Sequence, residues 1–87
     1  MKENVFIVIS NWFYEKSGYC DKNTDFVTRD KNKAIEKLKH IKEEELVING
    51  RLWDEDIFEK QDSSDYFFIM NNNGDWFEVD IVEKEID

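Results

Sequence analysis

The pair Asn73-Gly74 places the tightest constraint on how this chain can fold. An Asn-Gly pair tolerates the positive φ angles of a two-residue type I′ turn, so it predicts an antiparallel hairpin. Each flanking strand is expected to be about seven residues long. A two-residue turn places apolar residues opposite one another on one face of this hairpin. The predicted pairs are Met70 with Phe77, Phe68 with Val79, and Tyr66 with Ile81.

The same register predicts a second face of mixed character on this hairpin. Successive side chains of a strand point to opposite faces, so the residues between the apolar pairs project the other way. Large apolar groups and carboxylates lie together there. The six residues are Phe67, Ile69, Trp76, Glu78, Asp80 and Val82.

Two more strands are expected in the first third of the chain. Residues 5–9 are all apolar and mostly β-branched, which is typical of a strand buried on both faces, and we place it near the sheet centre. This strand continues through residues 11–14 into a polar stretch that contains Gly18. Residues 25–28 then indicate a short return strand, so the pair forms a hairpin with a long loop.

A helix is expected from Lys31 to about residues 42–45. Thr28 or Asp30 can cap its start, because a short side-chain oxygen accepts a hydrogen bond from an otherwise unpaired backbone N–H. The glutamates at 43–45 are unfavourable at the negative end of the helix dipole, so we expect the helix to stop or fray there. At about 100° per residue, four apolar side chains share one face. They are Ala34, Ile35, Leu38 and Ile41.

The expected architecture is a two-layer α+β fold in the order ββαββ. One main helix packs on one face of a mainly antiparallel sheet, which buries the apolar face of both layers. Residues 46–60 form a connector that can hold a short helix or a strand, with a turn favoured at Asn49-Gly50. A chain of 87 residues is expected to form a single domain over residues 1–87.

Charge is distributed unevenly along the chain. Residues 1–53 hold ten basic and nine acidic residues, whereas residues 54–87 hold two basic and twelve acidic residues, a net charge of −10. This asymmetry disfavours contact with nucleic acid and anionic membranes. It favours either a solvated surface that keeps the protein soluble or a basic protein partner.

No residue pattern in the sequence predicts catalysis. His40 lies opposite the apolar helix face, and Cys20 lacks an activating Lys, Arg or His in an evident motif. The acidic stretches 54–56 and 62–65 lack the spacing of a calcium-binding loop. We therefore expect no enzyme activity, no cofactor and no metal. The single cysteine and the lack of an export or membrane segment predict a cytoplasmic protein.

Aromatic residues are abundant, at thirteen of 87. Four phenylalanines are readily assigned to the core: Phe6, Phe26, Phe68 and Phe77. Four other aromatic side chains are harder to place: Trp12, Trp53, Phe67 and Trp76. Either a further element covers them, or they contribute to a binding surface, because tryptophans beside carboxylates are typical of interface anchors.

The candidate partner-binding residues combine charge with aromatic anchors. The carboxylates are Asp54, Glu55, Asp56, Glu59, Glu78 and Asp80, and the anchors are Phe67 and Trp76. Carboxylates can stand in for phosphates on a protein surface that normally holds nucleic acid. Binding of this kind depends steeply on salt.

Residues 26–38, a strand that ends in Thr and enters a charged helix with Ala and Leu inward, resemble small phage and mobile-element proteins. By size, acidity and lack of catalytic groups, the chain also resembles phage inhibitors of host defence, including anti-CRISPR and DNA-mimic proteins, and toxin-immunity proteins. The resemblance implies a target that normally holds nucleic acid. It assigns no functional residue.

Three functions follow as hypotheses. The first is an acidic inhibitor that occupies a basic, nucleic-acid-binding surface of a partner protein, without binding nucleic acid or membrane itself. The second is an immunity protein that neutralises a toxin nuclease. The third is a self-associating structural module in which exposed aromatic residues form a homodimer face.

Overall fold

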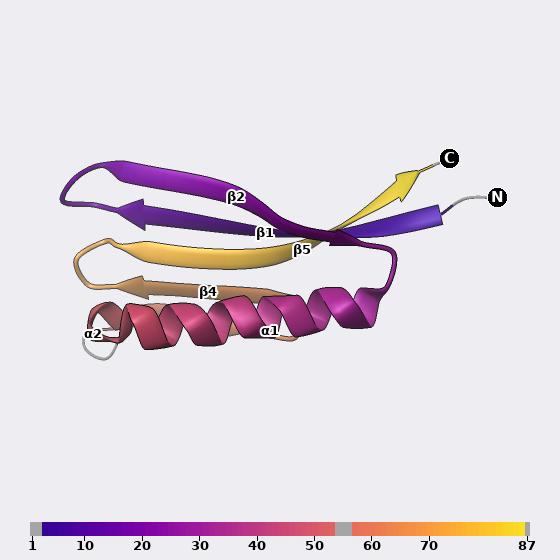
Figure 1. Cartoon of the computed structure of the whole chain (residues 1–87). Coiled ribbons are helices and arrows are strands. Elements are labelled where there is room, and N and C mark those ends of the chain that lie inside the picture. The colour runs from indigo at the N-terminus through magenta and orange to yellow at the C-terminus, as the bar shows by residue number, and fades with distance from the viewer. Residues whose placement is uncertain (1–2, 54–56, 87) are drawn as a thin grey trace.

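The chain folds into a five-stranded antiparallel sheet with one long helix on one of its faces (Figure 1). This computed structural model describes residues 3–53 and 57–86. The elements are β1 (Glu3–Tyr14), β2 (Tyr19–Thr28), α1 (Lys31–Ile48), α2 (Gly50–Trp53), β3 (Ile57–Asp62), β4 (Tyr66–Asn71) and β5 (Trp76–Ile86).

The strands lie in the order β2-β1-β5-β4-β3, and every neighbouring pair is antiparallel. The turns of the β1–β2 and β4–β5 hairpins lie at one end of the molecule, and the chain termini lie at the other (Figure 1). The α+β class and the antiparallel sheet with one main helix are thus confirmed. The expected ββαββ order lacks one strand, because the connector at 46–60 contains α2 and the beginning of β3.

Helix α1 begins where the sequence predicts and ends later. Asp30 is the cap, and its side chain accepts a hydrogen bond from the backbone N–H of Asn32 at 2.9 Å. Ala34 and Leu38 are fully buried against the sheet. The helix was expected to end at the glutamates, yet it continues to Ile48, because Glu45 turns inward and accepts hydrogen bonds from neighbouring side chains. These bonds compensate for the unfavourable end of the helix dipole.

The β4–β5 hairpin forms at the predicted place with a different register. Its loop has three residues, because Asn71 pairs with Asp75 and the backbone N–H of Gly74 donates to the carbonyl of Asn71 at 3.1 Å. Gly74 takes a φ of +90°, which suits the last position of a three-residue loop. The side-chain oxygen of Asn71 accepts from the backbone N–H of Asn73 and Asp75, which stabilises the longer loop.

A one-residue change of register exchanges the faces of β4 relative to β5. Met70 now lies opposite Trp76, and Ile69 lies opposite Phe77. The predicted pairs Met70–Phe77, Phe68–Val79 and Tyr66–Ile81 are therefore wrong. The face under α1 holds the core instead, in which strand residues pack with two helix residues and a tryptophan from α2. The fully enclosed cluster is Val8, Phe67, Ile69, Phe77, Val79, Ala34, Leu38 and Trp53.

The β1–β2 hairpin is longer and tighter than expected. Both strands extend to the turn at residues 15–18, where Gly18 takes a φ of +69°, so the predicted long loop is wrong. The prediction of a strand buried on both faces is also wrong. Val8 is fully buried under the helix, whereas Ile7 and Ile9 on the opposite face are half-buried, because no described helix covers that face.

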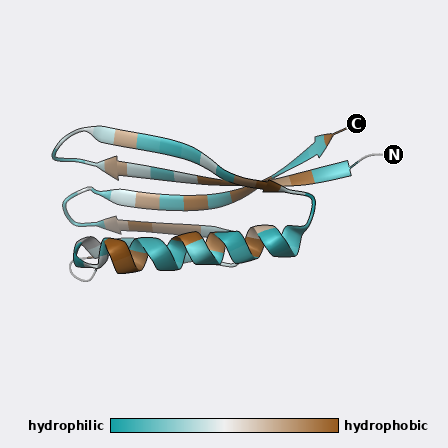
Figure 2. Cartoon of the chain, in the orientation of Figure 1, coloured by the Kyte–Doolittle hydropathy of each residue, from teal (hydrophilic) through white to brown (hydrophobic). Residues whose placement is uncertain are grey.

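The helices in the described part of the chain are short or polar. Figure 2 shows α1 as mainly hydrophilic, with its most apolar segment near its C-terminal end. None of the described helices has the length and apolar character needed to cross a membrane.

Candidate protein-interaction face

The sheet surface that points away from α1, which we call the outer face, is the candidate functional site. Paired residues of antiparallel strands project to the same side, so the register assigns its members. Its central members are half-buried, whereas members towards its edges, such as Glu59 and Val82, are exposed. The central members are Ile7, Ile9, Asn11 and Phe13 on β1, Trp76, Glu78 and Asp80 on β5, and Tyr66, Phe68 and Met70 on β4.

Three aromatic rings form a row across the outer face at the turn end of the sheet. The ring centroids of Phe13 and Trp76 are 6.0 Å apart with an interplanar angle of 23°, which is a stacked arrangement. Phe68 lies on the other side of Trp76, with centroids 6.1 Å apart. Trp76 is therefore held between rings from the two neighbouring strands, and this contact restricts its orientation before any partner arrives.

Next to the aromatic row, Glu78 is fixed by two hydrogen bonds. The hydroxyl of Tyr66 donates to one carboxylate oxygen at 2.6 Å, and the side-chain amide of Asn11 donates to the other at 3.2 Å. Burial and the hydrogen bond to Glu78 raise the pKa of Tyr66 to about 12. Tyr66 therefore remains a neutral donor at physiological pH.

Asp80 follows Glu78 on the same side of β5. Burial raises the pKa of Asp80, the backbone N–H of Ile81 lowers it in part, and the carboxylates of Glu78 and Asp65 raise it further. Within the described residues, ion pairs join Arg29 to Glu3 and Lys42 to Asp62. None of the described lysines or arginines forms an ion pair with Glu78 or Asp80, so a cation from another molecule would relieve the repulsion between them.

The structure divides the predicted partner-binding residues into three groups. Trp76, Glu78 and Asp80 lie together on the outer face, and Glu59 is exposed on β3 opposite Met70, towards one edge of that face. Phe67 was predicted as an anchor, which is wrong, because it points into the core under α1 and is fully buried. Asp54, Glu55 and Asp56 lie outside the described residues.

Sequence reasoning missed seven of the ten central members of the outer face, namely all those on β1 and β4. On β1, residues 5–9 were expected to be buried on both faces, and no face was assigned to Asn11 or Phe13, while Phe68 on β4 was assigned to the core. Tyr66 was predicted to pair with Ile81, which placed it on the face of the sheet opposite to Glu78, whereas it pairs with Asp80 and lies on the same face as Glu78. The alternation Ile7, Ile9, Asn11, Phe13 was the available signal, because it places a polar amide in line with three apolar residues.

The remaining candidate residues have simpler positions. His40 is exposed on α1 and Cys20 is exposed on β2. In the parts of the chain that the structure describes, no three His, Cys, Asp or Glu side chains are placed to hold a metal ion. The outer face thus combines a preorganised aromatic surface with two carboxylates, an arrangement suited to binding.

Comparisons with known proteins returned no matching family, no curated relative and no similar solved structure.

Proposed function

We propose that this protein is an acidic inhibitor that binds, through its outer face, to a basic and nucleic-acid-binding surface of a partner protein. The observation that supports this proposal is the pairing of a stacked aromatic row with two carboxylates that no described cation neutralises. The aromatic row supplies apolar contact, and the carboxylates select the partner.

The apolar part of the face supplies most of the contact energy. Trp76 and its neighbours Phe13 and Phe68 are half-buried in the isolated chain, and a partner would cover the rest of these rings. Burial of apolar surface contributes roughly 25 cal/mol per Å², and tryptophan and tyrosine are the residue types most enriched among binding hot spots. The rings are already stacked, so little side-chain entropy is lost on binding.

The carboxylates favour one class of partner. Glu78 and Asp80 would accept hydrogen bonds from arginine or lysine side chains that otherwise contact phosphate, and charge-assisted bonds of this kind are strong. Residues 54–87 carry a net charge of −10, which attracts a basic surface over a distance of about a Debye length. A surface that normally holds nucleic acid has the required excess of basic residues.

A charge-matched pull-down tests the proposal. The tagged protein captures partners from a bacterial lysate, the complex is washed at low and then high salt, and mass spectrometry identifies what salt releases. The test variant is Glu78→Lys with Asp80→Lys. The control is Glu36→Lys with Glu43→Lys, which changes the net charge equally but lies on the exposed side of α1, on the opposite face.

We expect the wild type and the α1 control to retain one nucleic-acid-binding protein and the outer-face variant to lose it. Equal loss by both variants would show that net charge alone drives capture and would contradict the proposed face. Capture of a toxin nuclease, rather than a nucleic-acid enzyme of another kind, would favour the immunity function. Unchanged capture by the outer-face variant would refute the proposal.

A further inference from the structure

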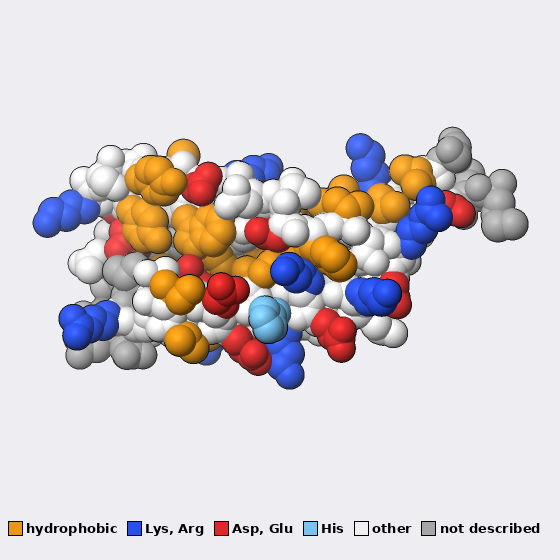
Figure 3. All heavy atoms as spheres, viewed as in Figure 1, with side chains coloured by type: hydrophobic (Ala, Val, Ile, Leu, Met, Phe, Trp, Pro, Cys, Tyr) orange, Lys and Arg blue, Asp and Glu red, His pale blue; other side chains and the backbone are white. Residues whose placement is uncertain are grey.

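A concave region lies on the side of the sheet opposite to the outer face, between α1 and the β1–β2 hairpin. One groove of about 290 Å³ runs beside Trp12, Asp25, Ile41 and Glu44, and a second of about 290 Å³ continues from it towards Tyr19. Trp12 and Glu45 line both grooves, so we treat them as one hairpin–helix groove. In Figure 3, apolar side chains gather on this side at the turn end of the molecule, with acidic groups among them.

The floor of the hairpin–helix groove is a tryptophan bound to a buried carboxylate. The indole N–H of Trp12 donates to Glu45 at 2.8 Å, and the other carboxylate oxygen accepts from Trp53 at 2.9 Å and Asn49 at 2.7 Å. The ring of Trp12 also packs against Phe77, with centroids 5.2 Å apart. All the donors to Glu45 are neutral, so none of the described lysines or arginines forms an ion pair with this carboxylate at the bottom of the groove.

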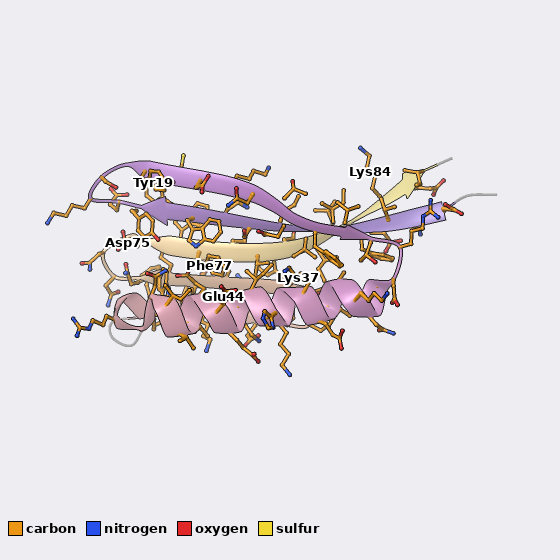
Figure 4. All side chains as sticks on the ribbon, viewed as in Figure 1. Tyr19, Lys37, Glu44, Asp75, Phe77 and Lys84 are labelled. Carbon is orange, nitrogen blue, oxygen red and sulfur yellow. The ribbon has the colours of Figure 1, made fainter. Side chains whose placement is uncertain are left out.

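The walls of the groove are aromatic and acidic. Tyr14 and Tyr19 stack with centroids 6.0 Å apart, and Tyr19 is 54% exposed. Burial, followed by the carboxylates of Glu45 and Asp75, raises the pKa of Tyr14, which indicates a negative potential at this position. Figure 4 shows Tyr19 on the hairpin side and Glu44 on the helix side of the groove.

The charges that line the groove are mostly negative. Three further carboxylates contribute, namely Asp21 in one part and Asp25 and Glu44 in the other. Lys37 is the one basic residue among the described lining residues. It lies on α1, away from the end of the groove where Tyr19 lies (Figure 4). A cation is therefore attracted towards the end of the groove that contains Trp12 and the two tyrosines.

We propose that the hairpin–helix groove binds an arginine side chain from a basic peptide segment of a partner protein. A planar guanidinium can stack on the exposed ring of Tyr19 while its N–H groups reach Asp21, which lines the same part of the groove. Glu44 lines the adjoining part and attracts the same basic segment by its charge. Charge complementarity selects this occupant, because a second copy of this chain carries a net charge of −9 and is repelled. The groove and the outer face lie on opposite sides of the sheet, so this proposal does not depend on the proposed function.

The probe is a capped tri-arginine peptide, and the readout is the set of indole N–H signals in ¹H–¹⁵N NMR at about 0.15 M salt, where distant charges are screened. The three tryptophans report on different places: Trp12 and Trp53 donate to Glu45 beneath the groove, and Trp76 lies on the outer face. We expect the Trp12 signal to shift and saturate while the Trp76 signal does not move. A capped tri-lysine peptide should bind more weakly because it stacks less well.

The test variant is Glu44→Lys and its matched control is Glu43→Lys, since both residues are exposed neighbours on α1 and only Glu44 lines the groove. We expect Glu44→Lys to weaken tri-arginine binding about five- to tenfold, because it replaces an attractive exposed charge pair with a repulsive one. Glu43→Lys should weaken binding less than about twofold, because Glu43 does not line the groove. A Tyr19→Ser variant should also bind more weakly. Equal shifts of Trp12 and Trp76, equal effects of the two lysine variants, or no shift of Trp12 would each overturn the proposal.

Discussion

Asp80 holds a charge at a position that disfavours it. It is half-buried, it lies near two other carboxylates, and burial raises its pKa. Residues selected only for stability rarely keep such an arrangement, whereas binding sites often retain groups that lower the stability of the isolated protein. Asp80 therefore offers a test in which stability and binding should change in opposite directions.

We predict that Asp80→Asn stabilises the isolated protein at pH 7. A carboxyl group whose pKa is raised on folding contributes most favourably below its ordinary pKa of 3.8, and this contribution is lost as the pH rises through the folded pKa. Asparagine avoids the loss because it carries no charge. Urea unfolding at pH 7 and pH 3 measures the free energy of unfolding of the variant and of the wild type. The variant should have the higher value at pH 7, and the difference should shrink at pH 3.

The control for this prediction is Glu43→Gln, which removes an exposed carboxylate from α1. Its effect on the free energy of unfolding should be small at both pH values, since exposed charges contribute little. A lower stability of Asp80→Asn at pH 7 would show that Asp80 makes a favourable interaction in the folded chain, and the argument for a strained carboxylate would fail.

Glu45 illustrates a residue whose role the sequence could not show. Its position near the helix end and its charge both favour exposure, and its neighbours at 43 and 44 are indeed exposed. It is 7% exposed because two indole N–H groups, one from β1 and one from α2, converge on it. Trp12 is 33 residues from Glu45 in sequence, and Trp53, eight residues away, reaches Glu45 only because the chain turns into α2, so no local pattern could identify the bonds.

At the scale of elements, the two hairpin glycines form a matched pair. Both take positive φ, +69° at Gly18 and +90° at Gly74. A Cβ on Gly18 would meet nothing within 4 Å, whereas a Cβ on Gly74 would lie 3.3 Å from the side chain of Glu15. We predict that each change to alanine lowers the free energy of unfolding by about 1–2 kcal/mol, with the larger loss for Gly74→Ala.

Thermal or urea unfolding of the two variants measures this order. The Gly74 hairpin is also tied to the other turn, because the backbone N–H of Glu15 donates to Asp75 at 2.9 Å, so strain at Gly74 affects both hairpins. An equal or larger loss for Gly18→Ala would mean that the contact with Glu15 relaxes at no cost and that φ alone sets the effect.

The elements were more predictable from sequence than their register. The cap at Asp30 and the inward residues Ala34 and Leu38 follow from local signals, and so does the place of the β4–β5 hairpin. The extra loop residue depends on the side chain of Asn71, which competes with the two-residue turn. This difference of one residue moved Phe67 from the predicted binding surface into the core.

Part of the candidate site did not depend on the register. Trp76, Glu78 and Asp80 alternate along one strand, so they share a face however β4 is paired. Phe13 and Asn11 join them only through the pairing of β1 with β5, which connects segments about 65 residues apart in sequence. Contacts between such distant segments are not encoded by a local pattern, and this is why the β1 half of the outer face was missed.

The whole molecule is more extended than a chain of this length usually is. Its radius of gyration is 14.1 Å, against about 12 Å for a compact domain of 87 residues. Its accessible surface is 6044 Å², against roughly 5500 Å² for a protein of this mass. Helix α1 and the short α2 cover one side of a five-stranded sheet, and the excess surface includes the apolar residues of the outer face.

An uncovered apolar sheet face promotes self-association unless charges oppose it. On the outer face, two copies packed face to face would bring Glu78 and Asp80 of each copy into one dehydrated layer, and neither carboxylate forms an ion pair with a described lysine or arginine of its own chain. We therefore predict that the wild type is monomeric at high micromolar concentration. The double variant Glu78→Gln with Asp80→Asn should dimerise, because it removes the repulsion and leaves the aromatic row intact.

Size-exclusion chromatography with light scattering measures the masses of the two proteins. A matched control, Glu36→Gln with Glu43→Gln, makes the same change in net charge on α1 and should remain monomeric. A dimeric wild type would instead favour the self-associating module and would mean that the carboxylates are accommodated between copies. If the double variant stays monomeric, then charge is not what prevents the outer faces from meeting, and their shape must disfavour a second copy while still admitting a different partner.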